Sequence, residues 1–268
     1  MKALLMIGAL LLSTPLYAAQ LVLDLGANAR TWQTEALLKH PEARTIRIAE
    51  DVSYKKPMTY RAVPLAALLT GVQSSDHLQA VALDGFAAEM PAAPLLARHG
   101  ARAWLAIEDP ASPWPPLSEG KSSAGPFYLV WTDPQAGPIS PEQWPYAVAT
   151  IKRLPAVAER FPALLPAASL AKDDPVNKGF ELFQKHCLAC HRLNGAGDAQ
   201  FGPDLNIPFN PTEYFSGDFL KRYIRDPQGL RRWPQGKMPG FSAAVLPDSE
   251  LDLLVGYLKH MAGRKQPQ

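Results

Sequence analysis

The five residues Cys187-Leu188-Ala189-Cys190-His191 decide what the second half of this chain is built around. Two thiols stand about one helical turn apart, and a histidine directly follows the second thiol. Thiols at this spacing reach the two vinyl groups on one side of a porphyrin, and the histidine then lies under the iron. The motif therefore predicts one covalent haem c, attached at Cys187 and Cys190, with His191 as an axial iron ligand.

Two other chemistries use paired cysteines, and the sequence favours neither. A redox disulfide motif usually opens a helix after a strand, whereas this pair ends a helical pattern that starts near Asp174. A structural zinc site takes four ligands, and the chain has 2 cysteines in total. Because both cysteines belong to the motif, no disulfide framework is expected elsewhere.

The segment from 174 to 264 resembles the class I cytochrome c family along its whole length. Besides C-x-x-C-H, the resemblance is carried by Gly202-Pro203-Asp204-Leu205 (GPDL). In that family the proline carbonyl accepts a hydrogen bond from the axial histidine. The resemblance implies that Pro203 holds His191 in this way, which fixes the ring and raises its basicity as a ligand.

The segment 237–241 (KMPGF) resembles the methionine loop of the same family, which implies that Met238 is the sixth iron ligand. The alternatives are that Met238 only packs, or that His186 or His260 completes a bis-histidine site. Trp233 either donates its indole N–H to a haem propionate, as similarly placed tryptophans do in some relatives, or merely covers the haem edge.

Helical periodicity supports an all-α domain here. One helix is predicted after Asp174, which is placed to cap it, a second over 218–226, and a last one from about Asp248. The family resemblance implies that the first and last helices cross. Gly179 lacks a side chain, so the helices can approach closely there, with Tyr257 as the expected contact.

The first 19 residues read as a secretory signal: a lysine, a short apolar run and a small-residue cleavage site. The apolar run is shorter than the roughly 20 residues of a spanning helix, which favours cleavage over an uncleaved membrane anchor. We therefore expect a periplasmic protein with no membrane span after signal cleavage.

Residues 20–160 predict a β-rich α+β domain with short helices. Alternating stretches indicate strands, and Asp84-Gly85 indicates the turn of a hairpin over 79–90. A Pro/Ala-rich stretch, 161–173, reads as a linker, and 265–268 as a tail. The expected architecture is multidomain, a β-rich α+β domain followed by the cytochrome-like domain.

Three pieces of the first domain resemble the sulfite-oxidase-like molybdopterin fold over roughly residues 44 to 153. They are Tyr60–Leu65, Asp84–Phe86 and Gly125–Val130. Catalytic members ligate molybdenum through a protein cysteine, and residues 20–186 contain none. The expectation is a degenerate, cofactor-free domain without molybdopterin. The histidines here, His40, His77 and His99, follow no ligand spacing.

The formal net charge of +2 gives no support to nucleic-acid binding. The locally basic stretch 225–237 either steers an acidic redox partner or is an ordinary solvated loop.

The expected function is one-electron transfer in the periplasm, without catalysis, the first domain docking a redox protein that donates or accepts the electron. The alternative is a molybdopterin-dependent oxidoreductase with a fused haem c as electron acceptor. A haem peroxidase needs an exchangeable sixth ligand and so conflicts with Met238.

Overall fold

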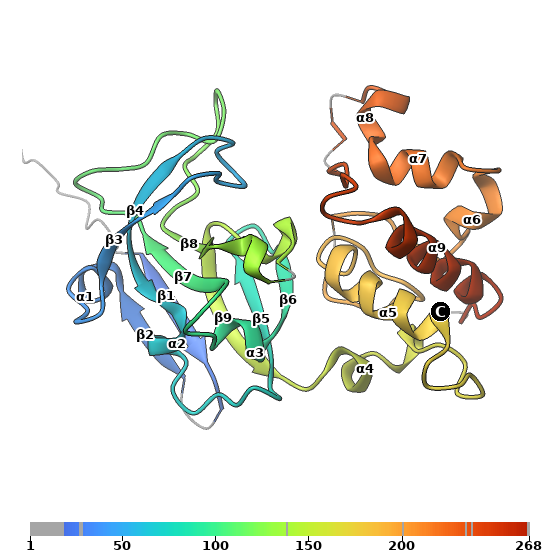
Figure 1. Cartoon of the computed structure of the whole chain (residues 1–268), viewed down its shortest axis with the longest axis horizontal. Coiled ribbons are helices and arrows are strands. Elements are labelled where there is room, and N and C mark those ends of the chain that lie inside the picture. The colour runs from blue at the N-terminus through green and yellow to red at the C-terminus, as the bar shows by residue number, and fades with distance from the viewer. Residues whose placement is uncertain are drawn as a thin grey trace, which may run out of the picture.

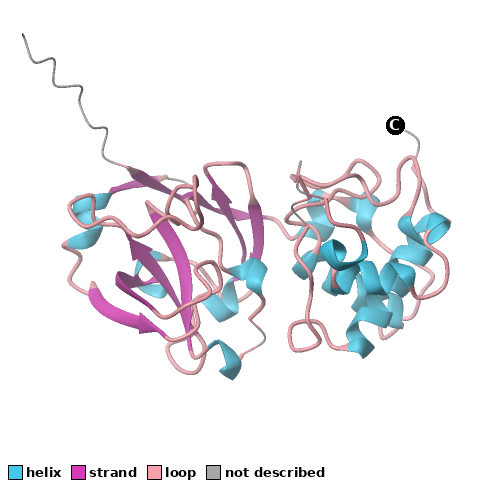
Figure 2. Cartoon of the chain, turned by 90° about the horizontal axis from the view of Figure 1, so that it is seen from above, coloured by secondary structure: helices cyan, strands magenta, loops and turns pink. Residues whose placement is uncertain are grey.

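The chain folds into two bodies that lie side by side, a β-rich one and a helical one (Figures 1 and 2). The computed structural model describes residues 19–26, 29–137, 139–199, 201–233, 235–236 and 238–266. The predicted signal segment, apart from Ala19, lies outside the described residues. Among the described helices, none has the length and apolar character needed to cross a membrane.

The strands described in the N-terminal body form two sheets. One has the order β2-β1-β9-β5-β6 and the other β3-β4-β7-β8. The strands are β1 (Gln20–Asp24), β2 (Arg30–Gln33), β3 (Arg44–Ile48), β4 (Met58–Pro64), β5 (His77–Ala82), β6 (Ala87–Pro91), β7 (Arg102–Ile107), β8 (Phe127–Thr132) and β9 (Val148–Leu154). Short helices connect them: α1 (Thr34–Leu38), α2 (Leu65–Leu68), α3 (Ala92–Leu95), η1 (Pro134–Ala136) and η2 (Pro141–Gln143). The predicted β-rich α+β character is confirmed.

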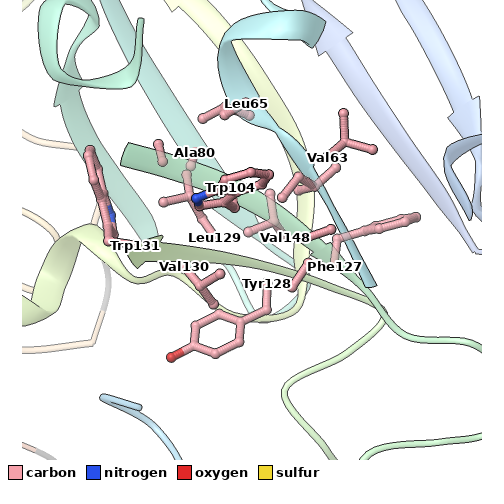
Figure 3. Packing of buried hydrophobic residues seen from close by; sticks show 14 of the residues in the cluster. Val63, Leu65, Ala80, Trp104, Phe127, Tyr128, Leu129, Val130, Trp131 and Val148 are labelled. Carbon is pink, nitrogen blue, oxygen red and sulfur yellow. The ribbon is translucent and has the colours of Figure 1, made fainter. Parts of the chain in front are cut away.

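The core of this body is centred on β7 and β8, which pair antiparallel. Both strands are buried almost throughout, so their sequences read as apolar runs rather than as alternation. Figure 3 shows Trp104 and Leu129 from these strands packed near Val63 of β4. Trp104 also donates its indole N–H to Thr132 Oγ1 at 3.0 Å, so its one polar group is satisfied.

The hairpin predicted around Asp84-Gly85 is confirmed as the β5–β6 pair. Its loop is longer than the two-residue turn that Asp-Gly suggests, because Ala82 N–H donates to Phe86 O and leaves Leu83, Asp84 and Gly85 between them. Gly85 has a φ of +91°, a conformation that favours glycine. The Asp84 carboxylate accepts from Phe86 N–H and stabilises the loop.

The C-terminal body is helical, with α5 (Pro175–His186), α6 (Pro211–Tyr214), α7 (Phe219–Arg225), α8 (Pro227–Leu230) and α9 (Asp248–Ala262). The Asp174 side chain accepts from Val176 N–H and caps α5, as predicted. Helices α5 and α9 cross at Gly179, where a Cβ would overlap Leu253 O and the Tyr257 side chain. The predicted crossing at a glycine is therefore confirmed.

The segment predicted as a linker, 161–173, is not a free tether. The chain between the bodies forms α4 (Val157–Arg160) and η3 (Pro162–Leu164), and Val157 and Leu164 are buried in the C-terminal core. Tyr257 donates its hydroxyl to Leu164 O at 2.7 Å. The proline-rich composition suggested an exposed connection, but its apolar side chains fill space beside α9.

Candidate functional site

The C-x-x-C-H motif forms a turn that continues directly from the end of α5. Cys187 follows the last helical residue, and its N–H donates to Phe183 O at 2.9 Å. His191 N–H then donates to Cys187 O at 2.8 Å, so the chain keeps turning after the helix. The two thiols are not joined in a disulfide. This local fold places both thiols and the imidazole on consecutive turns, as the spacing predicts.

The imidazole of His191 is fixed by the loop that contains Pro203. His191 Nδ1 lies 2.8 Å from Pro203 O, and because a carbonyl only accepts, Nδ1 carries the proton. Gly202 lies directly behind the ring, where a Cβ would overlap it, and Gly202 N–H donates to Cys190 O at 2.8 Å. This arrangement leaves Nε2 as the free lone-pair donor, the arrangement of a histidine that binds a metal.

Burial favours the neutral form of each group in the motif. Desolvation lowers the pKa of His191, against the opposing hydrogen bond to Pro203. Burial, assisted by the carboxylates of Glu142 and Asp84, raises the pKa of Cys190 to about 11, and burial also raises the pKa of Cys187. Neutral imidazole is the form that binds a metal, and a protonated thiol carries the hydrogen that adds with sulfur across a vinyl group.

Met238 is partly buried and packs against the core of the helical body. The loop that follows it is tied to α7: Phe241 N–H donates to Ile224 O at 3.1 Å, and Arg225 Nη1 donates to Phe241 O at 2.8 Å. The Phe241 ring contacts His186 edge-on with centroids 5.6 Å apart, so this loop lies beside the end of α5. The methionine loop and the motif are therefore close together.

Each of the two rival histidine ligands has one ring nitrogen in contact with a group outside the motif. His186 Nδ1 lies 3.4 Å from Glu142 Oε2, and its ring is fully buried against Phe241. His260 Nε2 accepts from Ala167 N–H at 3.0 Å, on the linker side of α9. The contact at Nε2 disfavours His260 as an iron ligand, and the position of His186 directly before Cys187 disfavours His186.

Two buried polar atoms beside the motif have no hydrogen-bond partner within the described residues: His186 Nε2 and Arg192 Nε. A buried donor without a partner is costly, and a bound group commonly satisfies it. Arg192 directly follows His191, and a guanidinium N–H there fits an anionic group such as a haem propionate. The donor set and these free groups fit haem c.

Trp233 is 57% exposed, and the guanidinium of Arg231 lies 5.2 Å from the centroid of its ring. Its backbone N–H donates to Gln228 Oε1 at 3.0 Å. The contact of its indole with a propionate stays a prediction.

Asp51 anchors the polar centre of the N-terminal body, and sequence reasoning missed it. It is 2% exposed and accepts from the Tyr60 hydroxyl at 2.7 Å and the Tyr128 hydroxyl at 3.2 Å. It also accepts from Ser53 and Tyr54 N–H, so this carboxylate is fully hydrogen-bonded. An isolated aspartate after a strand carries no signal that distinguishes such a role.

The histidines of this body do not form a metal site. His77 of β5 pairs with Glu89 of β6, whereas His40 Nδ1 accepts from Glu42 N–H in the loop after α1. The two side chains therefore lie in different parts of the domain. Across the described residues, no group of three His, Cys, Asp or Glu side chains is arranged to hold a metal ion.

Comparison with known families decides the nature of the helical body. The family model described as cytochrome c matches residues 176–262. This part of the chain is a cytochrome c domain. Such a domain indicates electron transfer by covalent haem c in a protein located outside the cytoplasm. No curated protein sequence matches the chain.

Among solved structures, the chain is similar to the sulfane dehydrogenase SoxCD from Paracoccus pantotrophus, at 19% identity and a TM-score of 0.36. The similarity covers 53% of this chain and 40% of the SoxCD chain, so this chain spans less than half the length of the SoxCD chain. The sulfite-oxidase-like assignment of the N-terminal domain therefore stays a prediction from its sequence.

Proposed function

We propose that this protein is a periplasmic one-electron carrier with a single haem c. Cys187 and Cys190 hold the haem by thioethers, and His191 and Met238 are the axial ligands. One observation carries the proposal: the motif ends α5 with His191 Nδ1 bound to Pro203 O at 2.8 Å, which leaves Nε2 free for iron. The N-terminal domain serves as a docking module for the redox partner.

Bound haem c supplies one reversible electron, and the protein's residues determine how it does so. With His191 and Met238 both bound to it, the iron would have no site left for substrate or oxygen, which favours electron transfer over catalysis. A thioether ligand such as Met238 also raises the reduction potential. The Pro203 carbonyl keeps the His191 ring in one orientation, so little rearrangement accompanies a change of charge.

Covalent attachment is tested by mass. Expressed with export and haem-attachment machinery, the full chain should gain the mass of one haem over the mature polypeptide and keep its haem under denaturing electrophoresis. Cys187→Ala and Cys190→Ala should each leave at most one thioether, and the protein made without that machinery is the control. A wild-type protein that releases haem into acidic organic solvent would overturn the proposal.

The second candidate function is a molybdopterin-dependent oxidoreductase, and the resemblance of the N-terminal domain is what favours it. It needs a ligand for molybdenum, whereas the two thiols lie in the cytochrome c domain and the Asp51 carboxylate is saturated by hydrogen bonds. Metal analysis of the protein purified from a host that makes molybdopterin decides between the two. Stoichiometric molybdenum would establish the oxidoreductase, and its absence from a haem-loaded protein supports the carrier.

A further inference from the structure

The β5–β6 hairpin of the N-terminal domain lies beside the edge where the haem is attached. The Phe86 ring, just after the hairpin loop, approaches the ring of Phe201 in the cytochrome c domain, with centroids 6.4 Å apart. From β5, Gln79 Nε2 donates to Asp198 Oδ2 at 2.6 Å. Both partners lie in the loop that follows His191, so the hairpin faces the C-x-x-C-H edge rather than the far side of the domain.

A largely buried ionic contact keeps the two domains in this position. Arg160, which is 13% exposed, binds Glu89 Oε1 at 2.6 Å through Nη2 and Asp198 Oδ2 at 2.7 Å through Nη1. Its guanidinium thus joins β6 to the loop of the cytochrome c domain. A second contact, between Glu142 and His186, connects η2 to the end of α5. The hairpin is therefore a fixed part of the surroundings of the haem edge.

Large apolar side chains stay exposed at this place. Leu83 is 69% exposed, and Tyr146 and Phe201 are each 40% exposed. Leu83 N–H donates to Ala147 O at 2.9 Å, which places the hairpin loop next to Tyr146. Grouped apolar side chains on a surface commonly mark an interaction site. We call Leu83, Asp84, Tyr146 and Phe201 the seam surface.

The charge of the seam surface is negative. Asp84 is exposed in the hairpin loop between Leu83 and Gly85, and its carboxylate accepts from the N–H of Phe86, whose ring approaches Phe201. The neighbouring cation, Arg160, is neutralised by Glu89 and Asp198. A cationic partner is therefore attracted to this edge of the domain.

The sequence offers the basic stretch 225–237 as a site for an acidic redox partner, but its first residue, Arg225, is not free to attract one. Arg225 is turned inward, where its guanidinium donates to Phe241 O and Leu246 O and pairs with Asp248. An acidic partner thus finds this cation already bound.

We propose that the seam surface docks a cationic redox protein, one that presents an apolar contact ringed by lysines, at the haem edge next to Cys190. The inference rests on the proposed function and names the partner's chemistry. A single electron passes between the two centres, so one is oxidised as the other is reduced, and no bond is made or broken. Apolar contact at Leu83 and Phe201 brings the centres close, and Asp84 supplies the attraction.

Redox-inert paramagnetic complexes of opposite charge show where a cation binds the protein, because they broaden nearby NMR signals and transfer no electron. In the reduced, haem-loaded full chain, hexaamminechromium(III) should broaden the amide NMR signals of Asp84, Gly85, Tyr146 and Phe201, whereas hexacyanochromate(III) should not. Asp84→Asn removes the charge but keeps an oxygen that accepts from Phe86 N–H, so the loop persists. This variant should lose most of the broadening. Broadening centred elsewhere on the domain would overturn the proposal.

Electron exchange gives the second readout. Oxidation of the reduced protein by tris(phenanthroline)cobalt(III) should slow roughly two- to ten-fold in Asp84→Asn at low ionic strength, and oxidation by ferricyanide should quicken. The matched control is Glu50→Gln, which removes an exposed carboxylate that follows β3 in the N-terminal domain and is not part of the seam surface.

Equal rate ratios for Asp84→Asn and Glu50→Gln would overturn the docking proposal. An unchanged haem spectrum in both variants shows that the carrier function itself still stands, so the two failures are distinguishable.

Discussion

At the scale of single residues, Gly202 shows how closely the site is built. Gly202 lies against the His191 ring, and its own N–H donates to Cys190 O. A side chain at this position would therefore have to displace either the ring or the loop. A methyl group added here pushes the imidazole away from the Pro203 carbonyl. The absence of a side chain at this position is therefore a requirement of the ligand, not of the loop.

The first prediction is that Gly202→Ala disturbs haem ligation while the fold survives. The oxidised variant should show an altered haem spectrum. Its free energy of unfolding should be lower than that of wild type by roughly 1 to 3 kcal/mol, the range for overpacking. Absorption spectroscopy and thermal unfolding of the haem-loaded protein check it. A spectrum and stability equal to wild type would contradict the geometry given for His191.

The residues of the site were largely predictable because their chemistry depends on local spacing. The C-x-x-C-H motif places three groups within five positions, and Pro203 and Met238 follow it in loops that the family resemblance identifies. Arg192 was missed, because nothing in the sequence distinguishes a buried arginine from an exposed one. The interdomain pairing of Arg160 with Asp198 was also beyond reach, since it joins residues 38 positions apart.

At the scale of elements, the crossing of α5 and α9 holds the cytochrome c domain together. The helices touch at Gly179, and Tyr257 packs against Phe180 and Phe183 with ring centroids 5.6 and 5.4 Å apart. A second glycine, Gly256, lies in α9 with open space where its Cβ would stand. The two positions form a natural pair for comparison.

The second prediction uses that pair. Gly179→Ala should destabilise the protein by roughly 1 to 3 kcal/mol, because the methyl group forces the helices apart. Gly256→Ala should stabilise it by roughly 0.5 to 1 kcal/mol, because alanine favours the helix and nothing is displaced. Chemical unfolding of both variants checks the signs. If both changes shifted stability in the same direction, the close approach at Gly179 would be wrong.

Elements with a clear period or cap were predictable, and those shaped by distant contacts were not. Helix α5 carries Asp174 as a cap before an amphipathic run, and β8 is a short apolar strand. The segment 161–173 reads as a tether because prolines and alanines dominate it. Only the structure shows Leu164 buried beside Tyr257, a contact between residues 93 positions apart.

At the scale of the whole molecule, the two domains meet through charge as much as through apolar contact. Arg160 is the centre of that contact, and Glu89, 4% exposed, depends on it for a partner besides His77 and Gln79. Loss of the guanidinium leaves this carboxylate buried with less compensation. Arg160 therefore holds the hairpin beside the haem edge together with the Gln79–Asp198 and Phe86–Phe201 contacts.

The third prediction is that Arg160→Met loosens the domain contact. Stability should fall by roughly 1 to 3 kcal/mol, and amide hydrogen exchange should rise at the β5–β6 hairpin and at residues 198–201. Arg153→Met is the control, since Arg153 forms a half-exposed pair with Asp76 inside the N-terminal domain at 3.3 Å. That pair is worth roughly 0 to 1 kcal/mol. Equal exchange at the seam in both variants would contradict the role of Arg160.

The central claim is that His191 and Met238 saturate the iron, and the near-infrared spectrum of the oxidised protein tests it most directly. The wild-type protein should show the weak band of methionine-to-iron charge transfer, and Met238→Ala should lose it and bind carbon monoxide in its reduced form. Met261→Leu, a change in the buried stripe of α9, should keep the band. A wild-type protein without the band, or a band that survives in Met238→Ala, would contradict the account.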